Sequence, residues 1–503
     1  MSPRVVVLGA GIAGLVAAWE LALRGLRPLV LEAAPIAGGR TSTWRDDQGR
    51  TVDTGLHVVA DHYLNLQQVL ARLGVADRLH WVEKHTYLRA GRAPMAWYFS
   101  PYQPPFHLLR PAREMPLAPR TRLRLGRVAL LLASMDQADL AALDGETYKQ
   151  WHDRMGLGRD FMLELAEAAG DAATFLPVDR AAARAVISWL KYLMRHRRAG
   201  DVGLFRGTMA EAFIDPLVRE ITALGGEVRL SSAVTRLILD DAAQAPRVSH
   251  VEIAPCRAAG PVHSASGEPP VADGRESIPC DHLISALSVQ ALQHLLAASG
   301  ERLLDRAGLG PMMGLTTTPA LSLIVTFDRP ITPVPEGAPL CTGVAMRDFI
   351  DMKLLGRGGL VPGAGSTYQF VITRSDRRIH DPDATIVADI VADLVSVWPG
   401  ARGAEVVSYA LERVGAAMFA AVPGAHALRP AVTTGAANFY IAGDFTRHEL
   451  NASMEGAAFS GRRAADALLR ALGRPGLDFP ELPDTTMVPL LRAARRRLAR
   501  SLT

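Results

Sequence analysis

Cysteine is scarce in this chain of 503 residues, and its placement provides no framework for cross-links. The three cysteines, Cys256, Cys280 and Cys341, are far apart, and no pair has the Cys-x-x-Cys spacing typical of zinc sites. An odd number without clustering argues against a disulfide framework. No Cys/His ligand pattern occurs either, so we predict that the protein has no metal site.

Long apolar runs are also missing. A membrane-spanning helix needs roughly 18 to 20 consecutive apolar residues, whereas the longest candidate, Val128 to Ala133, is far shorter. The N-terminal stretch passes directly from Arg4 into a strand and a glycine turn, without the apolar segment and cleavage site of a signal peptide. We therefore expect a cytoplasmic protein, and peripheral contact with the inner face of the membrane stays open.

Charge of one sign is not in large excess. The formal net charge is +4, and the basic residues are almost all arginine, because only Lys84, Lys149, Lys191 and Lys353 are lysines. No nucleic-acid-binding motif accompanies this balance, so we expect no nucleic acid partner. The chain is too long for one hydrophobic core, and about two or three lobes are expected.

The N-terminal region contains a strand, a glycine-rich turn, a helix and a second strand followed by an acidic residue. The strands cover Arg4 to Leu8 and Pro28 to Leu31, with a helix from Leu15 to Arg24 between them. Glycines in the G-x-G-x-x-G pattern permit a tight turn, close approach to a pyrophosphate and close helix packing. The helix N-terminus attracts phosphates, and the acid suits ribose hydroxyls; a glycine turn without a ligand is the alternative. The predicted dinucleotide site comprises Gly9, Ala10, Gly11, Ile12, Ala13, Gly14 and Glu32.

A second strand and helix near the C-terminal end complete the pattern. An apolar strand from Asn438 to Ala442 is followed by Gly443-Asp444, and a helix then extends to about Leu469. An aspartate at a strand end can bond ribityl hydroxyls, and the positive end of a helix stabilises negative charge on a flavin ring. An ordinary strand–helix unit without a ligand is the alternative. The residues predicted here are Gly443, Asp444, Ser453, Met454 and Glu455, of which Glu455 is expected to support the helix start.

Three further blocks resemble segments of the flavin amine oxidase superfamily. Gly38-Gly39-Arg40-Thr41-Ser42 is similar to the segment that extends the cofactor site there, where Arg40 would offset diphosphate charge. Val52-Asp53-Thr54-Gly55-Leu56-His57 resembles the stretch that passes the flavin ring, and the Val234 region resembles a strand that meets the adenine in these proteins. The resemblance implies FAD as the cofactor, held also by Gly38, Gly39, Arg40, Thr54, Gly55, Leu56, His57 and Val234.

Within that superfamily, the chain resembles the carotenoid and phytoene desaturases of the plant and cyanobacterial type. This resemblance implies an FAD-dependent oxidoreductase that acts on CH–CH groups of a long apolar isoprenoid or polyene, by hydride transfer to the flavin. A quinone or oxygen would be the electron acceptor. The blocks that carry the resemblance are 55–57, 63–67, 73–81, 225–230, 423–430, 439–446, 452–457 and 460–461.

Other functions of the same framework stay open. Hydroxysqualene dehydroxylases are near relatives of the desaturases, so a squalene-forming enzyme of that type is one alternative. An amine oxidase-type flavoenzyme is another, and it is less favoured because lysines are few and no Gly-Gly-Tyr-type signature precedes the C-terminal block. A flavin-binding escort protein without turnover is a third.

His57 is the candidate catalytic residue, because the resemblance places its segment beside the flavin. A histidine at such a position is either a base or a packed, hydrogen-bonded neighbour of the ring. Asp61, His62 and His448 are further candidates.

Together these motifs predict an α/β, two-dinucleotide-binding-domain flavoprotein, with a Rossmann-like FAD domain and an inserted mixed α+β substrate domain. Residues 95–135 mix aromatics with arginines, and residues 489–503 predict a basic amphipathic helix; each suits either a membrane surface or ordinary solvated structure. Residues 258–273 are expected to form a loop insertion in a hairpin. The predicted FAD domain combines 1–90, 205–290 and 405–470, the substrate-binding or cap domain combines 91–204 and 291–404, and 471–503 form a basic tail.

Overall fold

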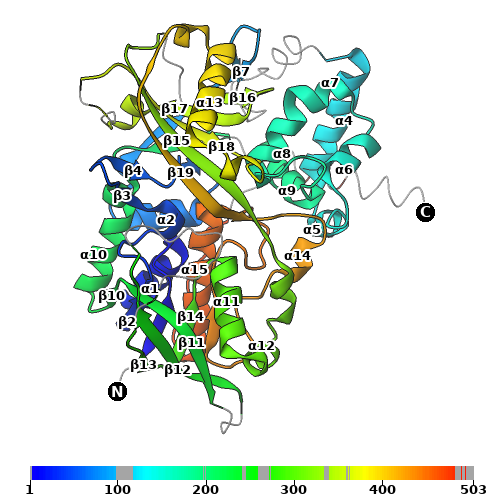
Figure 1. Ribbon diagram of the computed structural model, residues 1–503. Helices are drawn as coiled ribbons and strands as arrows, with labels where there is room; N and C mark the ends of the chain where they lie inside the picture. The colour runs from blue at the N-terminus through cyan, green and yellow to red at the C-terminus, as the bar shows by residue number, and fades with distance from the viewer. Residues whose placement is uncertain are drawn as a thin grey trace.

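The computed structural model places a parallel sheet in the lower half of the molecule, a larger mixed sheet above it and a group of helices to one side (Figure 1). Segments from the beginning, middle and end of the chain contribute to the parallel sheet. The structure describes residues 3–97, 117–195, 198, 200–240, 245–258, 271, 273–332, 339–357, 361, 363–481, 489 and 493.

Five parallel strands form the lower sheet, in the order β10–β2–β1–β14–β20. Strand β1 pairs with β2 on one side and β14 on the other, so that Val5 lies opposite both Pro28 and His282. All residues of β1 are apolar and buried, as expected for a strand covered on both faces. The bounds are β1 Val5–Leu8, β2 Pro28–Leu31, β10 Glu227–Arg229, β14 His282–Ser285 and β20 Phe439–Ile441.

Helices cover one face of this sheet, and an antiparallel sheet with two helices covers the other. Helix α1 (Ile12–Ala22) is buried along its whole length and packs against α15 (Met454–Ala471). The two helices cross closely at Gly461, where any side chain would overlap the carbonyl of Ala13. On the helical face lie also α2 Leu64–Arg72 and α10 Asp215–Ala223; on the other lie β11 Ser232–Asp240, β12 Arg247–Pro255, β13 Glu276–Pro279, α11 Val289–Ser299 and α12 Glu301–Ala307.

Seven strands form the upper sheet, in the order β19–β15–β18–β17–β16–β7–β8. Its two longest strands, β15 (Thr317–Phe327) and β19 (Val406–Phe419), run antiparallel to each other across the middle of Figure 1. Helix α13 (Asp383–Val397) covers one face through an apolar core. The remaining strands are β7 His85–Arg89, β8 Met95–Trp97, β16 Leu340–Thr342, β17 Met346–Asp351 and β18 Thr367–Ile372.

Strand pairing assigns two segments differently from the domain bounds that the sequence predicts. Strands β7 and β19 fall inside the segments predicted for the FAD domain, yet both belong to the upper sheet. The reason is that β19 pairs with β15 along nearly its whole length, a long-range contact that no local pattern announces. Both strands thus pair within the upper sheet, and the domain bounds stay a prediction.

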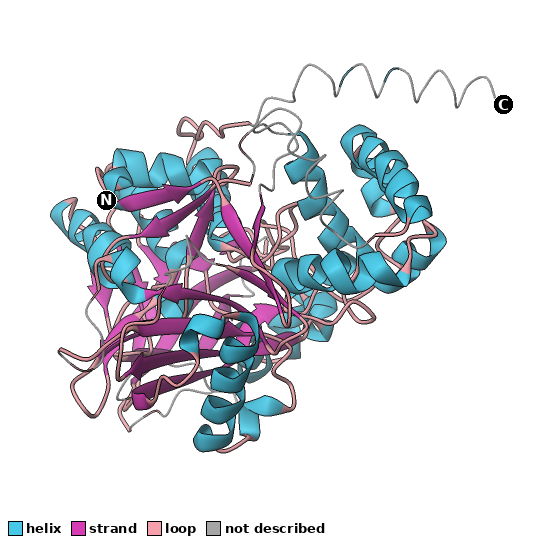
Figure 2. Cartoon of the chain, turned by 90° about the horizontal axis from the view of Figure 1, so that it is seen from above, coloured by secondary structure: helices cyan, strands magenta, loops and turns pink. Residues whose placement is uncertain are grey.

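Helices α4 to α9 form a group beside the two sheets, as the view from above shows (Figure 2). They have their own core, in which Tyr148 and Trp151 are almost completely buried. Within the segment 95–135, residues 98–116 lie outside the described residues, as does nearly all of the tail 489–503. The helices are α4 Pro119–Ser134, α5 Gln137–Ala141, α6 Tyr148–Arg154, α7 Arg159–Phe161, α8 Glu167–Thr174 and α9 Ala183–Arg195.

Short elements connect these three parts. Within the described ranges, no helix combines the length and apolar character that crossing a membrane requires, and no cluster of His, Cys, Asp or Glu could hold a metal ion. Of the predicted loop insertion, residues 259–270 and 272 lie outside the described ranges. The connecting elements include β3 Thr43–Arg45, β4 Thr51–Asp53, β5 Val58–Ala60, β6 Leu79–Val82, β9 Val202–Phe205 and α14 Ala425–Leu428.

Candidate functional site

A cavity of about 580 Å³ lies at the carboxyl ends of the parallel strands, between the two sheets. Its lower wall includes Leu31 and Gly443 from the strand ends, and its upper wall includes Ser322, Val371 and Val414. This edge of a parallel sheet is where ligands bind in doubly wound folds. The predicted site residues that line the cavity are Gly9, Gly11, Ile12, Ala13, Glu32, Gly38, Gly39, Arg40, Thr54, Gly55, Leu56, His57, Val234, Gly443, Asp444, Ser453 and Met454.

The glycine turn before α1 has the geometry of a phosphate cradle. Gly9 has a φ of +93°, a conformation that favours glycine. A side chain added at Gly11 would meet no atom closer than 4.0 Å and would occupy open space beside the turn. The first N–H groups of a helix have no partner inside it, and Ile12 and Ala13 both line the cavity. A diphosphate fits this turn, because the N–H groups and the helix dipole favour an anion there.

Two predicted residues lie behind the cradle and do not line the cavity. Ala10 is fully buried, and its N–H donates to Oε2 of Glu32 over 2.8 Å. Gly14 lies so close to the preceding turn that a side chain would overlap the carbonyl oxygen of Gly9. In the structure Ala10 and Gly14 support the shape of the turn from behind, and a direct cofactor contact of either residue stays a prediction.

Glu32 lines the cavity beyond the end of β2, with its carboxylate fixed by backbone groups. Oε2 accepts the N–H of Ala10 over 2.8 Å, and Oε1 accepts the N–H of Ala34 over 2.9 Å. Burial raises the pKa of this carboxyl, against the lowering effect of these bonds. Each carboxylate oxygen can accept a further hydrogen bond, so the geometry permits the ribose contact, which stays a prediction.

Arg40 joins the two halves of the predicted cofactor site. Its Nη2 lies 2.7 Å from Oδ1 of Asp444, and its Nη1 donates to the carbonyl of Ala417 over 2.8 Å. The sequence predicts that Arg40 offsets diphosphate charge. In the structure Asp444 already offsets part of the arginine charge, so Arg40 also holds the C-terminal half of the site against the N-terminal half.

Of the four predicted catalytic candidates, only His57 lines the cavity; Asp61, His62 and His448 do not. Its Nε2 lies 3.0 Å from the carbonyl oxygen of Arg40, and its Nδ1 is buried without a hydrogen-bond partner among the described residues. Burial lowers the pKa of this ring, against the opposing effects of Asp53 and the Arg40 carbonyl. The ring is therefore neutral near pH 7 and anchors the Arg40 backbone.

The start of α15 is fixed by neighbouring polar groups. Ser453 caps the helix by accepting a backbone N–H, and its side chain is hydrogen-bonded to Tyr63, which also lines the cavity. Glu455 does not line the cavity; its carboxylate accepts the N–H groups of Asn65 and Leu66 at the start of α2 over 3.0 and 2.8 Å. Both oxygens join α15 to α2, in keeping with the support of the helix start expected for Glu455, and its cofactor contact stays a prediction.

Several residues that line the cavity carry no motif in the sequence. At one end, Ser288 caps α11 and lines the cavity together with Gln290 and His294. A capping serine just after a strand is a signal that could locate this helix start from the sequence. Arg347 and Phe175 in the upper wall have no comparable signal, because they come from separate parts of the chain.

A phosphate cradle at the edge of a parallel sheet, with a second capped helix start at the same cavity, defines a flavoprotein of the two-dinucleotide-binding class. The profile of the family described as flavin containing amine oxidoreductase matches residues 12–469, and the chain belongs to this family. It is an FAD-dependent oxidoreductase, as the sequence predicts.

Relatives of known name cover nearly the whole chain. The 15-cis-phytoene desaturase of Synechococcus elongatus is 25% identical over 94% of this chain and 98% of its own length. The enzyme of the same name from Arabidopsis thaliana is 24% identical over 93% and 80%. A probable zeta-carotene desaturase of Synechococcus elongatus is 24% identical over 93% and 99%.

Solved structures confirm the predicted fold class. An oxidoreductase from Methanosarcina mazei matches with a TM-score of 0.67 and 16% identity, covering 92% of this chain and 99% of its own. Putrescine oxidase bound to putrescine matches with a TM-score of 0.66 and 16% identity over 93% and 99%. At this level of identity the likeness describes the fold alone.

Proposed function

We propose that this protein is an FAD-dependent dehydrogenase of a long apolar isoprenoid such as phytoene. The observation that carries the proposal is the likeness to phytoene desaturases, which extends over 94% of the chain for the Synechococcus elongatus relative. It therefore covers the upper sheet and the helices as well as the cofactor cradle. Apolar residues of the cavity support the proposal: Ala172, Phe175, Ala320, Leu321, Val371 and Val414.

Bound FAD supplies a two-electron acceptor for the substrate, and the protein supplies orientation and a dry, apolar environment. The turn at Gly9 and Gly11 would hold the diphosphate, and Ser453 with Tyr63 keeps the start of α15 in place. His57 acts in this proposal as the anchor of Arg40; a proton acceptor at its Nδ1 is the alternative, weakened by the lowered pKa of the ring. A quinone or oxygen would reoxidise the protein.

The cavity gives less support to amine oxidation. Flavin amine oxidases usually place a lysine near the flavin, and no described residue that lines this cavity is a lysine. Dehydrogenation of a neutral isoprenoid does not require such a lysine.

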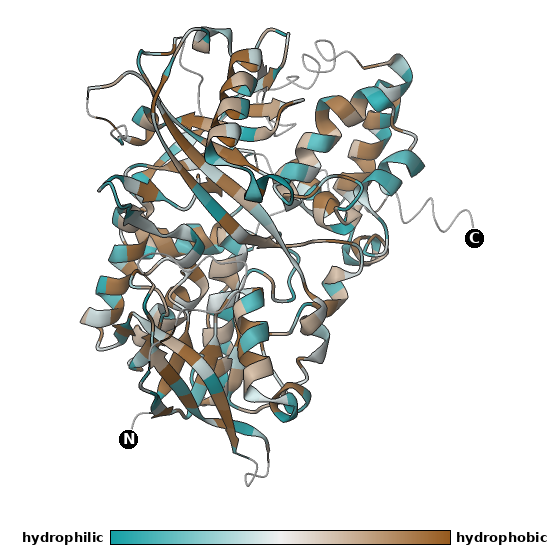
Figure 3. Cartoon of the chain, in the orientation of Figure 1, coloured by the Kyte–Doolittle hydropathy of each residue, from teal (hydrophilic) through white to brown (hydrophobic). Residues whose placement is uncertain are grey.

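Helix α4 supports peripheral membrane contact as part of this proposal. Its side chains Leu123 and Leu130 are 66% and 56% exposed, seven residues apart and thus on one helix face. Arginines flank them, and the mixture of hydrophilic and hydrophobic residues on the helical group is visible in Figure 3. An apolar substrate dissolved in a bilayer would reach the protein through such a surface.

Expression in cells that accumulate phytoene tests the proposal. We expect the wild-type protein to convert phytoene into more unsaturated products in the extracted lipids. The matched control is Gly11→Ala, whose added methyl group meets no atom closer than 4.0 Å and enters the space where the cradle would hold the diphosphate, so it should fold but bind FAD poorly. Unchanged phytoene beside a flavin-loaded wild-type protein would overturn phytoene as the substrate.

A further inference from the structure

Arg347 is a charged side chain in a mostly apolar part of the cavity wall. It lies in β17 at a β-bulge: Met346 pairs with Ile372 and Asp348 with the very next residue, Val371, so Arg347 is the extra residue. Bulges of this kind re-aim a side chain and occur next to active sites. The bulge in β17 therefore directs Arg347 toward the cavity.

The side chain of Arg347 is fixed by its neighbours, but one of its hydrogen-bond donors has no partner among the described residues. It is only 13% exposed, forms an ion pair with Asp348, and places its guanidinium 5.2 Å from the centre of the Phe175 ring. Its Nε is buried and has no hydrogen-bond partner within the part of the chain that the structure describes. A buried charged donor without a partner is costly, so a ligand group that accepts a hydrogen bond is expected there.

Phe175 itself is held in an uncommon conformation. It ends α8 with a φ of +59°, which is rare for an aromatic residue, and its carbonyl accepts the N–H of Arg374 over 3.3 Å. Such residues concentrate at ligand sites, where the surrounding structure holds them in place. Two irregular backbone positions, in β17 and at the end of α8, thus converge on one guanidinium.

Arg347 lies near the end of the cavity where α15 begins, which is the end predicted to hold the flavin ring. Burial raises the pKa of Tyr63 to about 12, while its bond to Ser453 and the charge of Arg347 act in the opposite direction. The arginine is therefore close enough to Tyr63 for its charge to be felt where α15 begins.

The charges around Arg347 indicate which oxygen group would fit. Asp348 already pairs with Arg347, and Asp171 lies 3.5 Å from Nε of Arg374, so these two acids and two bases balance. A carboxylate ligand would add negative charge beside buried Asp348 and Asp171. A neutral acceptor, a hydroxyl or carbonyl oxygen, adds a hydrogen bond without adding charge.

We infer that Arg347 is a specificity-determining residue that binds a neutral oxygen substituent of the isoprenoid substrate. This inference rests on the proposed function and narrows it from a plain hydrocarbon to an oxygen-bearing isoprenoid. Arginine has only donors, so it selects a hydroxyl or carbonyl group over a bare hydrocarbon chain.

The test compares phytoene with its terminally hydrated derivative, in which one water is added across a terminal double bond to give a hydroxyl group, on the purified FAD-loaded protein without oxygen. Dissociation constants come from the shift of the flavin spectrum, and rate constants from its bleaching at saturation. We expect about tenfold tighter binding of the hydroxylated compound by the wild type, as one added hydrogen bond to a charged group gives. Arg347→Met should abolish this preference, and Arg347→Lys should restore part of it.

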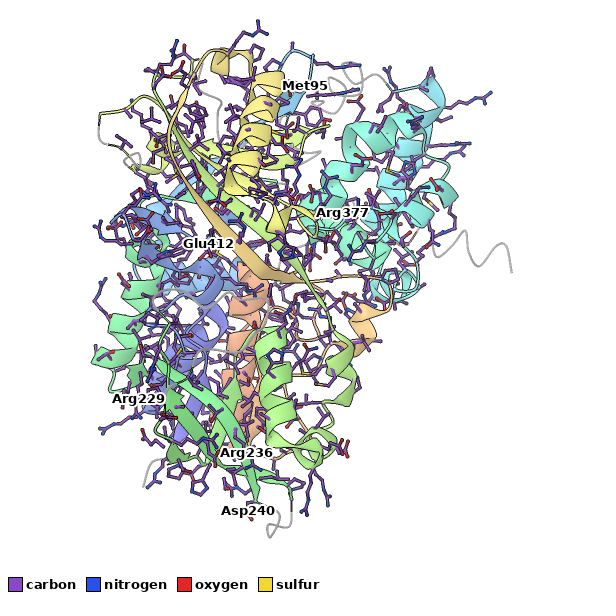
Figure 4. All side chains as sticks on the ribbon, viewed as in Figure 1. Met95, Arg229, Arg236, Asp240, Arg377 and Glu412 are labelled. Carbon is purple, nitrogen blue, oxygen red and sulfur yellow. The ribbon has the colours of Figure 1, made fainter. Side chains whose placement is uncertain are left out.

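The matched control is Arg377→Met, which removes the same charge from an exposed position, labelled in Figure 4, outside the cavity lining. It should leave the preference unchanged. Equal binding and bleaching of both compounds by the wild type would overturn the inference about Arg347 but not the proposed function. This comparison uses the wild-type protein alone, so it does not depend on whether a variant folds. Failure of both compounds to bind or bleach the flavin would overturn the proposed function itself.

Discussion

The lower and upper walls of the cavity are built in different ways. The lower wall consists of a glycine turn and helix starts at strand ends, where the conformation at Gly9 or the cap at Ser453 is specified by near neighbours. The upper wall takes Phe175 from the helical group and Arg347 from a bulged strand, and only tertiary packing brings them together. The predicted cofactor site is thus specified by local spacing, and the proposed substrate site by long-range packing.

The largest effect on stability and flavin binding is expected at Gly14, where the lower wall has no room for a side chain. Gly14→Ala would push a methyl group into the carbonyl oxygen of Gly9 and toward Ala286, so the turn must shift. We expect a loss of about 3 kcal/mol in stability and of most bound flavin. The control Gly126→Ala lies in an exposed helix with nothing within 4 Å and should raise stability slightly, by about 0.5–1 kcal/mol. Flavin content per chain and the unfolding midpoint measure both; a yellow, fully stable Gly14→Ala protein would contradict the close packing of this turn.

A smaller effect is expected at the junction of α15 and α2. The carboxylate of Glu455 accepts the backbone and side-chain N–H groups of Asn65 and the N–H of Leu66 over 2.8 to 3.0 Å. Glu455→Gln turns an amide N–H₂ toward these donors, which should cost about 1–3 kcal/mol. Glu301→Gln, at the exposed first residue of α12, is the control and should cost less, about 0.3–1 kcal/mol, because it loses only the attraction to the positive end of the helix. Equal midpoints for the two variants in denaturant unfolding would show that the junction is not stabilising.

The same contrast explains what the sequence could predict. The strand, turn and helix around Gly11 and the helix start at Ser453 follow from local patterns, and the structure brings both to one cavity. The hydrogen bonds of Glu455 could not be predicted from local patterns, because its partners in α2 lie far away along the chain. The membership of β19 in the upper sheet and the bulge at Arg347 depend on strand pairing, which periodicity within one segment does not reveal.

The upper sheet also contains a partly buried carboxyl group, Glu412, that should make the stability of the upper wall depend on pH. Glu412, labelled in Figure 4, lies opposite Ser322 of the cavity wall, and burial raises its pKa from 4.5 to about 7, against the lowering effect of Arg413. Below pH 4.5 the group is protonated in both folded and unfolded chains. Between about pH 4.5 and 7 the unfolded chain ionises first, so stability contributed by the neutral group is lost as pH rises.

Glu412→Gln cannot ionise and should escape this loss. Its unfolding midpoint should match that of the wild type near pH 4.5 and exceed it near pH 8. Thermal unfolding of both proteins across this range, in the same buffers, provides the measurement. Parallel curves would mean that Glu412 is well solvated in the folded protein.

The smallest effect on stability is expected on the outer surface of the helical group. Replacing Leu123 and Leu130 together by Gln should change stability by less than about 0.5 kcal/mol, because both are exposed. Co-sedimentation with anionic vesicles should fall severalfold, since apolar contact with the bilayer is lost. Unchanged sedimentation of the double variant would remove α4 from the proposed membrane contact.

The most direct test of the whole account is anaerobic mixing of the purified yellow protein with phytoene presented in vesicles. We predict that the flavin absorbance bleaches and returns when a quinone or oxygen is added. A flavin that stays oxidised in the presence of both phytoene and its hydrated derivative would contradict it, because the cavity would then hold the cofactor without oxidising an isoprenoid.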